Sequence, residues 1–306
     1  MVQAAGPLGS VVQVVDTGVS TRSGYRRRLG AGSNTLVLLS RTAFVDRGGR
    51  GDDQARRALL QWMAAHRLGQ DRELVARVAA RRKHALERLR ARGLTVVRLQ
   101  ATPMWRLAVG LGNQTNAHET GLALHGTYGW PVIPGSTLKG LTCAWALQSS
   151  AAPDQVAVVF GLPRVQSLTA PADASPADDQ PRASRGGVRF LDALPVAAPV
   201  RVALDVLTPH VQPYYTDTSG NADGAAGRQP PAECHNPVPV QFLVIDGGSF
   251  AIDLVGRSAE HVERAADWCA AAFDELGTGA KTAAGYGYLK VDARETLTGD
   301  AQGATM

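Results

Sequence analysis

The chain reads Leu276-Gly277-Thr278-Gly279-Ala280-Lys281-Thr282-Ala283-Ala284-Gly285-Tyr286-Gly287-Tyr288 near its C-terminus, between a helical pattern and a strand-like one. Its glycines allow positive φ angles and the close approach of another backbone. The lysine adds a mobile positive charge, exposed N–H groups can form an anion-binding concavity, and tyrosine can stack on a base. This segment, named here the glycine-rich loop (residues 276–288), therefore predicts a loop that holds a polyanionic chain.

The order of these residues argues against a nucleotide-hydrolysing P-loop. That motif places Lys directly after the last Gly, between a strand and the helix that follows it. Here Ala280 separates Gly279 from Lys281, and the helical pattern precedes the loop. A glycine-rich helix exit without any ligand is the alternative interpretation.

Composition is typical of a globular protein with a substantial core. Of the 306 residues, 44% are hydrophobic and 19% are charged, and no apolar run reaches the length of a membrane span. The N-terminus shows no charged and apolar regions of a secretion signal. Cys143, Cys234 and Cys269 are odd in number and far apart, which favours a reducing cytoplasm over a disulfide framework.

Positive charge is concentrated in the first third of the chain. Residues 1–100 carry 19 Lys and Arg against 7 Asp and Glu, whereas residues 101–306 carry 13 against 20. We therefore expect residues 1–100 to form a basic, partly helical region that favours a nucleic acid or an acidic partner. A solvated amphipathic helix is the alternative for such a charge run.

Local signals divide this N-terminal region further. Residues 52–92 have helical spacing, with Asp52 able to cap the start, Gly93 able to end the helix and Gly69 able to divide it in two. The short apolar run Leu36–Leu39 predicts a strand.

Strand and helix patterns alternate from residue 101 onward. Strands are predicted at residues 105–111, 188–191, 200–207, 240–245, 249–255 and 286–291, and helices at 137–148 and 259–276. Asp246-Gly247-Gly248 is a hairpin signature between two of these strands.

Composition also predicts where the core is interrupted. Residues 170–187 and 216–233 are expected to be disordered insertions, and 293–306 a flexible tail. Without the insertions the order is βαββαβ. The predicted fold class for residues 101–292 is therefore α+β, with a ferredoxin-like (RRM-like) core and the glycine-rich loop after its second helix. The aromatic signature of an ordinary RNA-recognition motif is missing.

Several motifs taken together are more specific than any one alone. They are Thr120-Gly121-Leu122 with Pro131–Gly140, then Phe190–Ala193, and then the glycine-rich loop. With these motifs the chain resembles the RAMP superfamily of CRISPR-associated RNA-binding proteins, over about residues 101–291. Asp205–Tyr215, followed by Asn236–Val240, is similar to one branch of it, the sixth subunit of the type III-B (Cmr-type) effector complex.

This resemblance implies a non-catalytic, cytoplasmic RNA-binding subunit without cofactor or metal. Such a subunit would contact the 3′ part of the guide RNA (crRNA) and cap the filament of backbone subunits in antiviral defence. The implied partners are guide RNA, target RNA and sibling RAMP subunits, and no membrane. Guide pairing rather than the protein would supply sequence specificity.

Two groups of expected RNA-binding residues follow strands or open a helix. Free N–H groups and the helix dipole attract phosphate at a helix start, where the residues are Ser136, Thr137 and Lys139. A plain cap is the alternative for Ser136. Stacking on a base or ribose is expected after the strand at 200–207, from His210, Tyr214 and Tyr215. Buried tyrosines at a core edge are the alternative there.

The remaining expected contacts lie before the helix and in the glycine-rich loop. His125 either lines the RNA groove or turns its own loop. In the glycine-rich loop the expected contacts are Gly277, Gly279, Lys281, Thr282, Gly285, Tyr286 and Gly287.

Two other functions stay open at this point. A RAMP-type endoribonuclease, processing guide RNA by His/Tyr general acid–base chemistry, would need His125, His210 and Tyr215 to converge. The loop at residues 112–119 has no aspartate of the kind attributed to metal-dependent cleavage in sibling subunits, which argues against catalysis. A purely structural assembly subunit without RNA contact is the third possibility.

Overall fold

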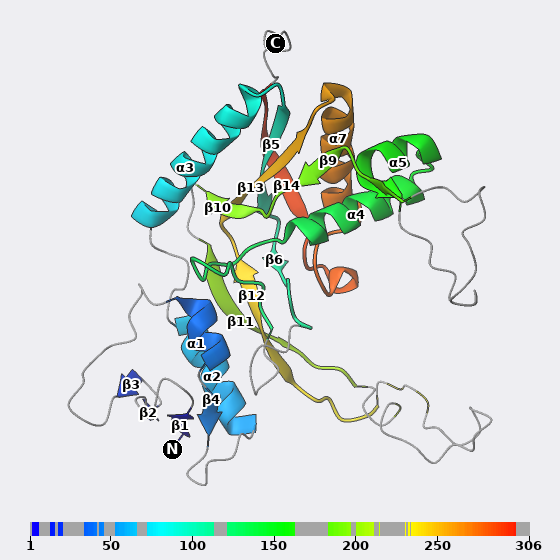
Figure 1. Ribbon diagram of the computed structural model, residues 1–306. Helices are drawn as coiled ribbons and strands as arrows, with labels where there is room; N and C mark the ends of the chain where they lie inside the picture. Colours follow the sequence, from blue (N-terminus) through cyan, green and yellow to red (C-terminus); the bar gives the residue numbers. More distant parts are fainter. Residues whose placement is uncertain are drawn as a thin grey trace, which may run out of the picture.

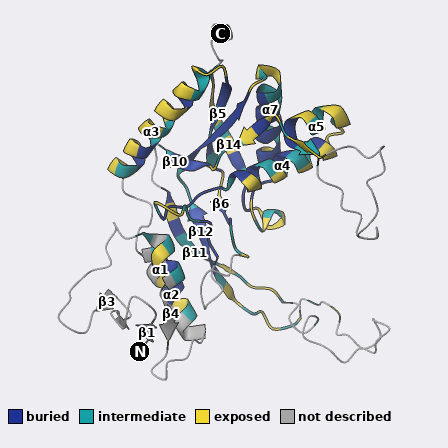
Figure 2. Cartoon of the chain, viewed as in Figure 1, coloured by how far each residue is buried: buried dark blue, intermediate teal, exposed yellow. Residues whose placement is uncertain are grey.

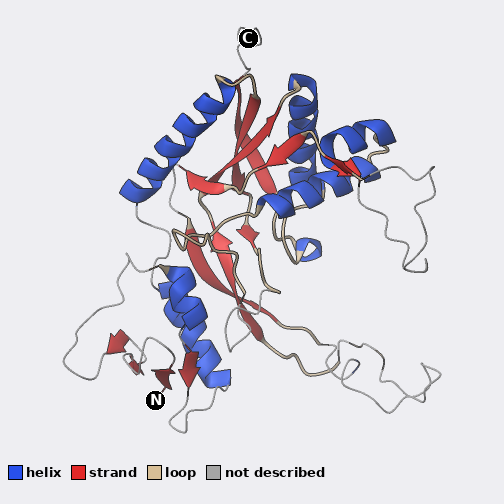
Figure 3. Cartoon of the chain, in the orientation of Figure 1, coloured by secondary structure: helices blue, strands red, loops and turns tan. Residues whose placement is uncertain are grey.

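The computed structural model describes residues 2–5, 13–15, 18–20, 34–41, 43–45, 53–65, 72–112, 121–162, 183–196, 200–210, 214, 230, 232 and 234–297. These residues form an α+β protein whose sheets are antiparallel, as predicted (Figures 1 and 3). None of the helices in this described part is long and apolar enough to cross a bilayer.

The main sheet is built around β5 (Thr95–Pro103). Strands β13 (Ser249–Gly256) and β14 (Leu289–Leu297) flank β5, and β10 (Leu194–Val196) and β9 (Val188–Phe190) pair with β13. The resulting order is β10-β13-β5-β14, with all neighbours antiparallel. Every residue of β13 is buried, so both faces of the sheet are covered at its centre (Figure 2).

Helices provide this cover on both faces. α7 (Ala259–Glu275) packs against β5, β13 and β14, and α4 (Gly135–Gln148) packs against α7. α3 (Arg72–Arg90) lies on the opposite face, where Leu86 packs with Val96 and Val255 (Figure 1). Alternating residues of a strand point to opposite faces, which is why Val96 meets α3 while its neighbours face α7.

A buried ion-pair network ties α3 to the main sheet. The Asp253 carboxylate on β13 is fully buried and accepts from Arg82 of α3 at 2.5 Å and from Arg98 of β5 at 2.7 Å. Burial lowers the pKa of Arg98, but the hydrogen bond and charge of Asp253 outweigh it, so the pKa is raised overall. Removing Asp253 would leave two largely buried guanidinium groups without their shared carboxylate, which is strongly destabilising.

A second sheet, in the order β11-β12-β6, lies beside the first. β11 (Arg201–Leu207) pairs with β12 (Val240–Asp246) along its whole length, and β6 (Arg106–Leu107) pairs only with the end of β12. α2 (Asp53–Ala65) packs on β11 and β12, so this helix of the N-terminal region belongs to the same folded body as the second sheet (Figure 1).

The remaining elements are short. A four-stranded sheet in the order β3-β2-β1-β4 contains β1 (Val2–Ala5), β2 (Gln13–Val15), β3 (Gly18–Ser20) and β4 (Ala43–Val45). The others are α1 (Thr35–Arg41), α5 (Pro153–Phe160), the pair β7 (Gly161–Leu162) and β8 (Ser184–Arg185), and the 3-10 helix η1 (Thr282–Ala284).

The predicted helices at 137–148 and 259–276 are confirmed, and the helical stretch predicted at 52–92 contains α2 and α3. Gly69, where a division was expected, lies outside the described residues. The strand predicted at Leu36–Leu39 is wrong, because these residues form part of α1. The predicted strand at 105–111 is reduced to β6. The sequence division after residue 100 falls inside β5, which continues unbroken through the main sheet.

The hairpin predicted at Asp246-Gly247-Gly248 is also wrong. β12 and β13 follow each other along the chain but pair in different sheets. The turn instead brings the backbone of Gly248 close to that of Val200, since a Cβ on Gly248 would lie 2.8 Å from the Cα of Val200.

Two of the segments predicted to be disordered are partly ordered. Residues 293–297 belong to β14, and residues 184–185 form β8. The rest of the predicted tail and most of both predicted insertions lie outside the described residues.

Candidate functional site

Main-chain hydrogen bonds hold the glycine-rich loop in place. The N–H of Gly287 donates to the carbonyl of Arg106 at 2.8 Å, and the N–H of Ala280 donates to the carbonyl of Ala108 at 2.7 Å. Inside the loop the N–H of Thr278 donates to the carbonyl of Gly287 at 2.7 Å. The loop is thereby fixed along the segment that contains β6.

Glycine is required at two of these positions. A Cβ on Gly287 would lie 2.1 Å from the carbonyl oxygen of Thr278, and one on Gly279 would lie 2.4 Å from that of Ala108. A Cβ on Gly285 would have no atom within 4 Å, so no other backbone approaches this glycine closely. Only its φ of 88° favours glycine there.

Lys281 is the exposed cation of the loop. Its backbone takes the left-handed conformation, with a φ of 62°, directly before η1. Its Nζ lies 5.0 Å from the ring centroid of Phe242 on β12. Within the described part of the chain it has no carboxylate partner. A cation held over an aromatic face and free of an acid is available to a phosphate.

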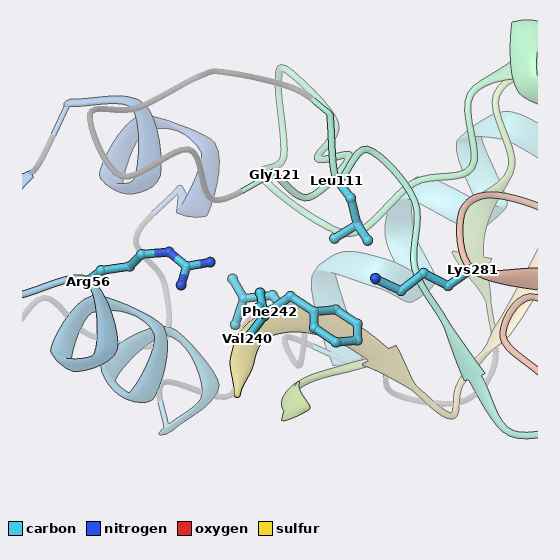
Figure 4. A pocket seen from close by; sticks show the side chains of 7 residues that line it. Arg56, Leu111, Gly121, Val240, Phe242 and Lys281 are labelled. Carbon is cyan, nitrogen blue, oxygen red and sulfur yellow. The ribbon is translucent and has the colours of Figure 1, made fainter. Parts of the chain in front are cut away.

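Lys281 and Arg56 lie at opposite ends of a pocket of about 170 Å³ (Figure 4). The pocket lies against β12, and its lining consists of Arg56, Leu111, Gly121, Val240, Phe242, Leu243 and Lys281. Among the described residues, no acidic side chain lines it. Arg56 donates a hydrogen bond of 2.9 Å to the carbonyl of Gln241, which holds the guanidinium at the pocket. Two cations above an apolar floor suit a phosphate joined to a sugar or base.

Tyr286 is a structural residue of the loop. It is 2% exposed, and its hydroxyl donates to Asp205 at 2.7 Å, while Arg106 reaches the same carboxylate oxygen at 2.6 Å. Burial and the hydrogen bond to Asp205 raise the pKa of Tyr286 to about 12. Burial raises the pKa of Asp205, but hydrogen bonds from Tyr286 and Arg106 outweigh it and lower that pKa overall. A ring buried in this way cannot stack on a base, contrary to the expectation from sequence.

The helix start at α4 differs from its predicted form. Pro134 is the N-cap and no side chain of the helix caps it, so a cap by Ser136 is wrong. The carboxylate of Asp192 accepts from the N–H of Gly135 at 2.7 Å instead. Ser136 is exposed, and Thr137 and Lys139 are half-buried. Because a carboxylate already occupies this helix end, a phosphate would compete with it, and phosphate contact here stays a prediction.

His125 belongs to an aromatic stack that turns its own loop. Its ring stacks on Tyr128 with centroids 4.8 Å apart, and Tyr128 stacks on Trp130 at 4.7 Å. Its Nδ1 accepts from the N–H of Thr127 at 3.2 Å. Burial lowers the pKa of His125, the charge of Asp192 opposes this, and the shift is downward overall.

The other predicted residues lie elsewhere or beyond the described residues. His210 follows β11, where its Nδ1 lies 3.1 Å from the carbonyl of His235. Tyr214 is half-buried, and Tyr215 lies outside the described residues. No contact in the described structure joins His210 to His125, and no cluster of metal-ligating side chains occurs there.

Sequence reasoning missed the residues that complete this surface. Arg56 comes from a helix far from the loop in sequence, and Phe242 lies on a segment predicted only to be a strand. Asp205 begins the Asp205–Tyr215 motif, but no contact with the loop was expected of it. The basic character of residues 1–100 was the one signal for Arg56. Only the pairing of β11 with β12 brings Asp205 and Phe242 together under the loop.

The chain is similar in sequence to known proteins. The model of the RAMP superfamily matches residues 98–290. Among curated proteins, the CRISPR system Cmr subunit Cmr6 of Pyrococcus furiosus is 28% identical over 229 residues, which cover 60% of this chain and 64% of that protein. The chain therefore spans just under two thirds of the length of this relative.

One solved structure supports the fold, and a second is matched more weakly. A cryo-EM structure of the type III-B Cmr-beta bound to cognate target RNA matches with a TM-score of 0.58 and 18% identity, over 80% of this chain and 74% of that chain. The crystal structure of Cmr6 from Pyrococcus furiosus gives a TM-score of 0.38 and 24% identity, over 66% and 99% of the two chains. Because the family model covers more than half of the sequence, the chain belongs to the RAMP superfamily.

Proposed function

We propose that the chain is a non-catalytic RNA-binding subunit of a type III-B CRISPR effector complex. In this proposal it contacts the 3′ part of the guide RNA and caps the filament of backbone subunits. Family membership and the identity with Cmr6 support the placement in such a complex. Guide RNA, target RNA and sibling subunits are then its partners, and the cytoplasm is its location.

The proposal includes a ferredoxin-like core. Along the chain the elements β5, α4, β10, β13, α7 and β14 follow in the order βαββαβ. Their strands lie in the order β10-β13-β5-β14, all antiparallel, which supports this architecture.

One observation carries the RNA-binding role: Lys281, which is exposed and has no carboxylate partner among the described residues, faces Arg56 across an apolar pocket. The main-chain network fixes the loop that presents Lys281, so little conformational entropy is lost when a phosphate binds. Since α3 and α7 cover both faces of the main sheet, the RNA path expected here runs over the glycine-rich loop and β12 rather than across the open sheet of an ordinary RNA-recognition module.

Crosslinking in the assembled complex tests this function. Guide RNA with 4-thiouridine at successive positions is assembled with the full chain and its sibling subunits, irradiated, and mapped by mass spectrometry. Crosslinks from the 3′ part of the guide to residues 276–288 or to β12 are expected. Crosslinks to sibling subunits with none to this chain would leave it a purely structural assembly subunit.

A further inference from the structure

Trp105 is a large aromatic residue that is not buried in the core. It lies in the turn between β5 and β6 and is 50% exposed, and the adjacent Met104 is 64% exposed. Exposure of half or more of two adjacent large apolar side chains is unfavourable, and an exposed aromatic ring commonly serves a binding surface.

The indole is nevertheless held in a fixed position. The ring of Tyr286 packs against it with centroids 4.8 Å apart, and the guanidinium of Arg106 lies 5.3 Å from its centroid. Tyr286 and Arg106 both bind the same oxygen of Asp205, at 2.7 and 2.6 Å, so they contact the indole from the Asp205 side. About half of the surface of Trp105 stays exposed, at 50%.

The turn that carries Trp105 is joined to the glycine-rich loop on both sides. The N–H of Met104 donates to the carbonyl of Tyr288 at 2.9 Å, and the N–H of Gly287 donates to the carbonyl of Arg106 at 2.8 Å. Tyr286 in turn contacts Phe242 at 5.7 Å, and Lys281 lies over Phe242. A continuous row of contacts therefore leads from Trp105 through Tyr286 and Phe242 to Lys281.

We propose that Trp105 is a stacking platform for one base of the RNA strand that Lys281 holds by its phosphate. The inference rests on the proposed RNA-binding function and adds to it a second contact of different chemistry. Grooves for single-stranded RNA combine cations along the backbone with aromatic rings on which bases stack. Because Asp205, Arg106 and Tyr286 fix the ring beforehand, stacking orders no free side chain.

The surroundings favour a base over a protein partner. Interfaces between proteins have a core depleted in charge. The indole instead contacts Arg106 of the Arg106–Asp205 ion pair. It is also connected to Lys281 through the rings of Tyr286 and Phe242. Such stacking is tolerant of sequence because every base has an aromatic face, which suits a subunit that must accept any guide.

Two variants of similar apolar bulk separate stacking from packing. Trp105→Phe keeps an aromatic face, whereas Trp105→Leu keeps only apolar contact with Tyr286. Each is assembled as the full chain with its sibling subunits on guide RNA that carries one 2-aminopurine at successive 3′ positions. Leu147→Ala, at a 62% exposed apolar residue on α4, is the control.

Trp105→Leu is expected to restore 2-aminopurine fluorescence at one position or two adjacent positions and to weaken RNA retention about tenfold. Trp105→Phe is expected to keep most of the quenching. Equal fluorescence at every position in the wild type and Trp105→Leu would overturn the inference. Loss of the subunit from the complex with unchanged RNA affinity would also overturn it, because Trp105 would then be a protein contact.

Lys281→Ala, measured in parallel, distinguishes failure of the stacking inference from failure of the proposed RNA-binding function. If Lys281→Ala weakens retention while Trp105→Leu has no effect, only the stacking inference fails. If neither variant changes retention or fluorescence, the proposed RNA-binding surface itself is wrong.

Discussion

Asp192 accepts a hydrogen bond from the backbone N–H of Gly135 at 2.7 Å, although the two residues are 57 positions apart in sequence. The carboxylate therefore caps α4 from outside the helix and places a negative charge at the positive end of its dipole. This contact joins the segment after β9 to the start of α4.

Asp192→Ala should lower the free energy of unfolding by about 1 kcal/mol, because α4 loses its only side-chain cap among the described residues. Urea denaturation followed by circular dichroism measures the change. Asp192→Asn keeps an acceptor oxygen and should lose less. Equal losses for the two variants would show that the hydrogen bond does not matter.

Lys281→Ala should weaken guide-RNA retention uniformly across guide sequences, since a phosphate contact carries no base information. The slope of log affinity against log salt should become shallower by about one unit. Filter binding at several salt concentrations measures both. Lys290→Ala, at an exposed lysine on β14, is the control and should change little. Wild-type affinity in a folded Lys281→Ala protein would show that the loop is a glycine-rich helix exit without a ligand.

Lys281→Gly should separate stability from binding. It removes the cation and relieves a left-handed backbone that costs a non-glycine residue about 1 kcal/mol. Its melting temperature should therefore rise while RNA retention falls. Unchanged RNA retention in a folded Lys281→Gly protein would contradict the assignment of Lys281 to binding.

Gly287→Ala should be far more destabilising than Gly285→Ala. A Cβ at Gly287 meets the carbonyl of Thr278 at 2.1 Å, whereas one at Gly285 meets nothing within 4 Å. Gly285→Ala should cost about 1 kcal/mol for its positive φ alone. Thermal unfolding of both variants provides the comparison, and similar melting temperatures would be inconsistent with the close approach at Gly287.

Asp205→Asn should change the acid limb of the stability curve. The pKa of Asp205 is lowered in the folded protein, so its stabilising contribution is present above its unfolded pKa of about 4 and is lost as pH falls through the lower folded pKa. The difference in unfolding free energy between wild type and Asp205→Asn should therefore shrink below about pH 4. A constant difference from about pH 7 to about pH 2.5 would exclude this role for the carboxylate.

The sequence predicted the main helices, because periodicity is a local property. That the glycine-rich loop holds a polyanionic chain stays a prediction. The separate sheets of β12 and β13 could not be predicted in this way. Asp246-Gly247-Gly248 satisfies the local rule for a hairpin, but the approach of Gly248 to Val200 depends on a strand distant in sequence. Tertiary contact decided the pairing there.

The candidate site was only partly predictable for the same reason. Lys281 stood out because it is a cation among glycines, but the burial of Tyr286 depends on Asp205 and Arg106, which come from two other strands. Arg56 reaches the pocket only because α2 packs on the second sheet. Residue type alone therefore identified the exposed Lys281 but did not predict the burial of Tyr286.

Hydrogen bonds between main-chain groups hold the backbone of the glycine-rich loop, while Ala283 and Ala284 are exposed within η1. The shape of the loop is thus independent of the chemistry of these two side chains. Photoreactive or fluorescent amino acids can be placed at either position without altering the backbone that the RNA would meet. The loop itself can therefore serve as a reporter on its ligand.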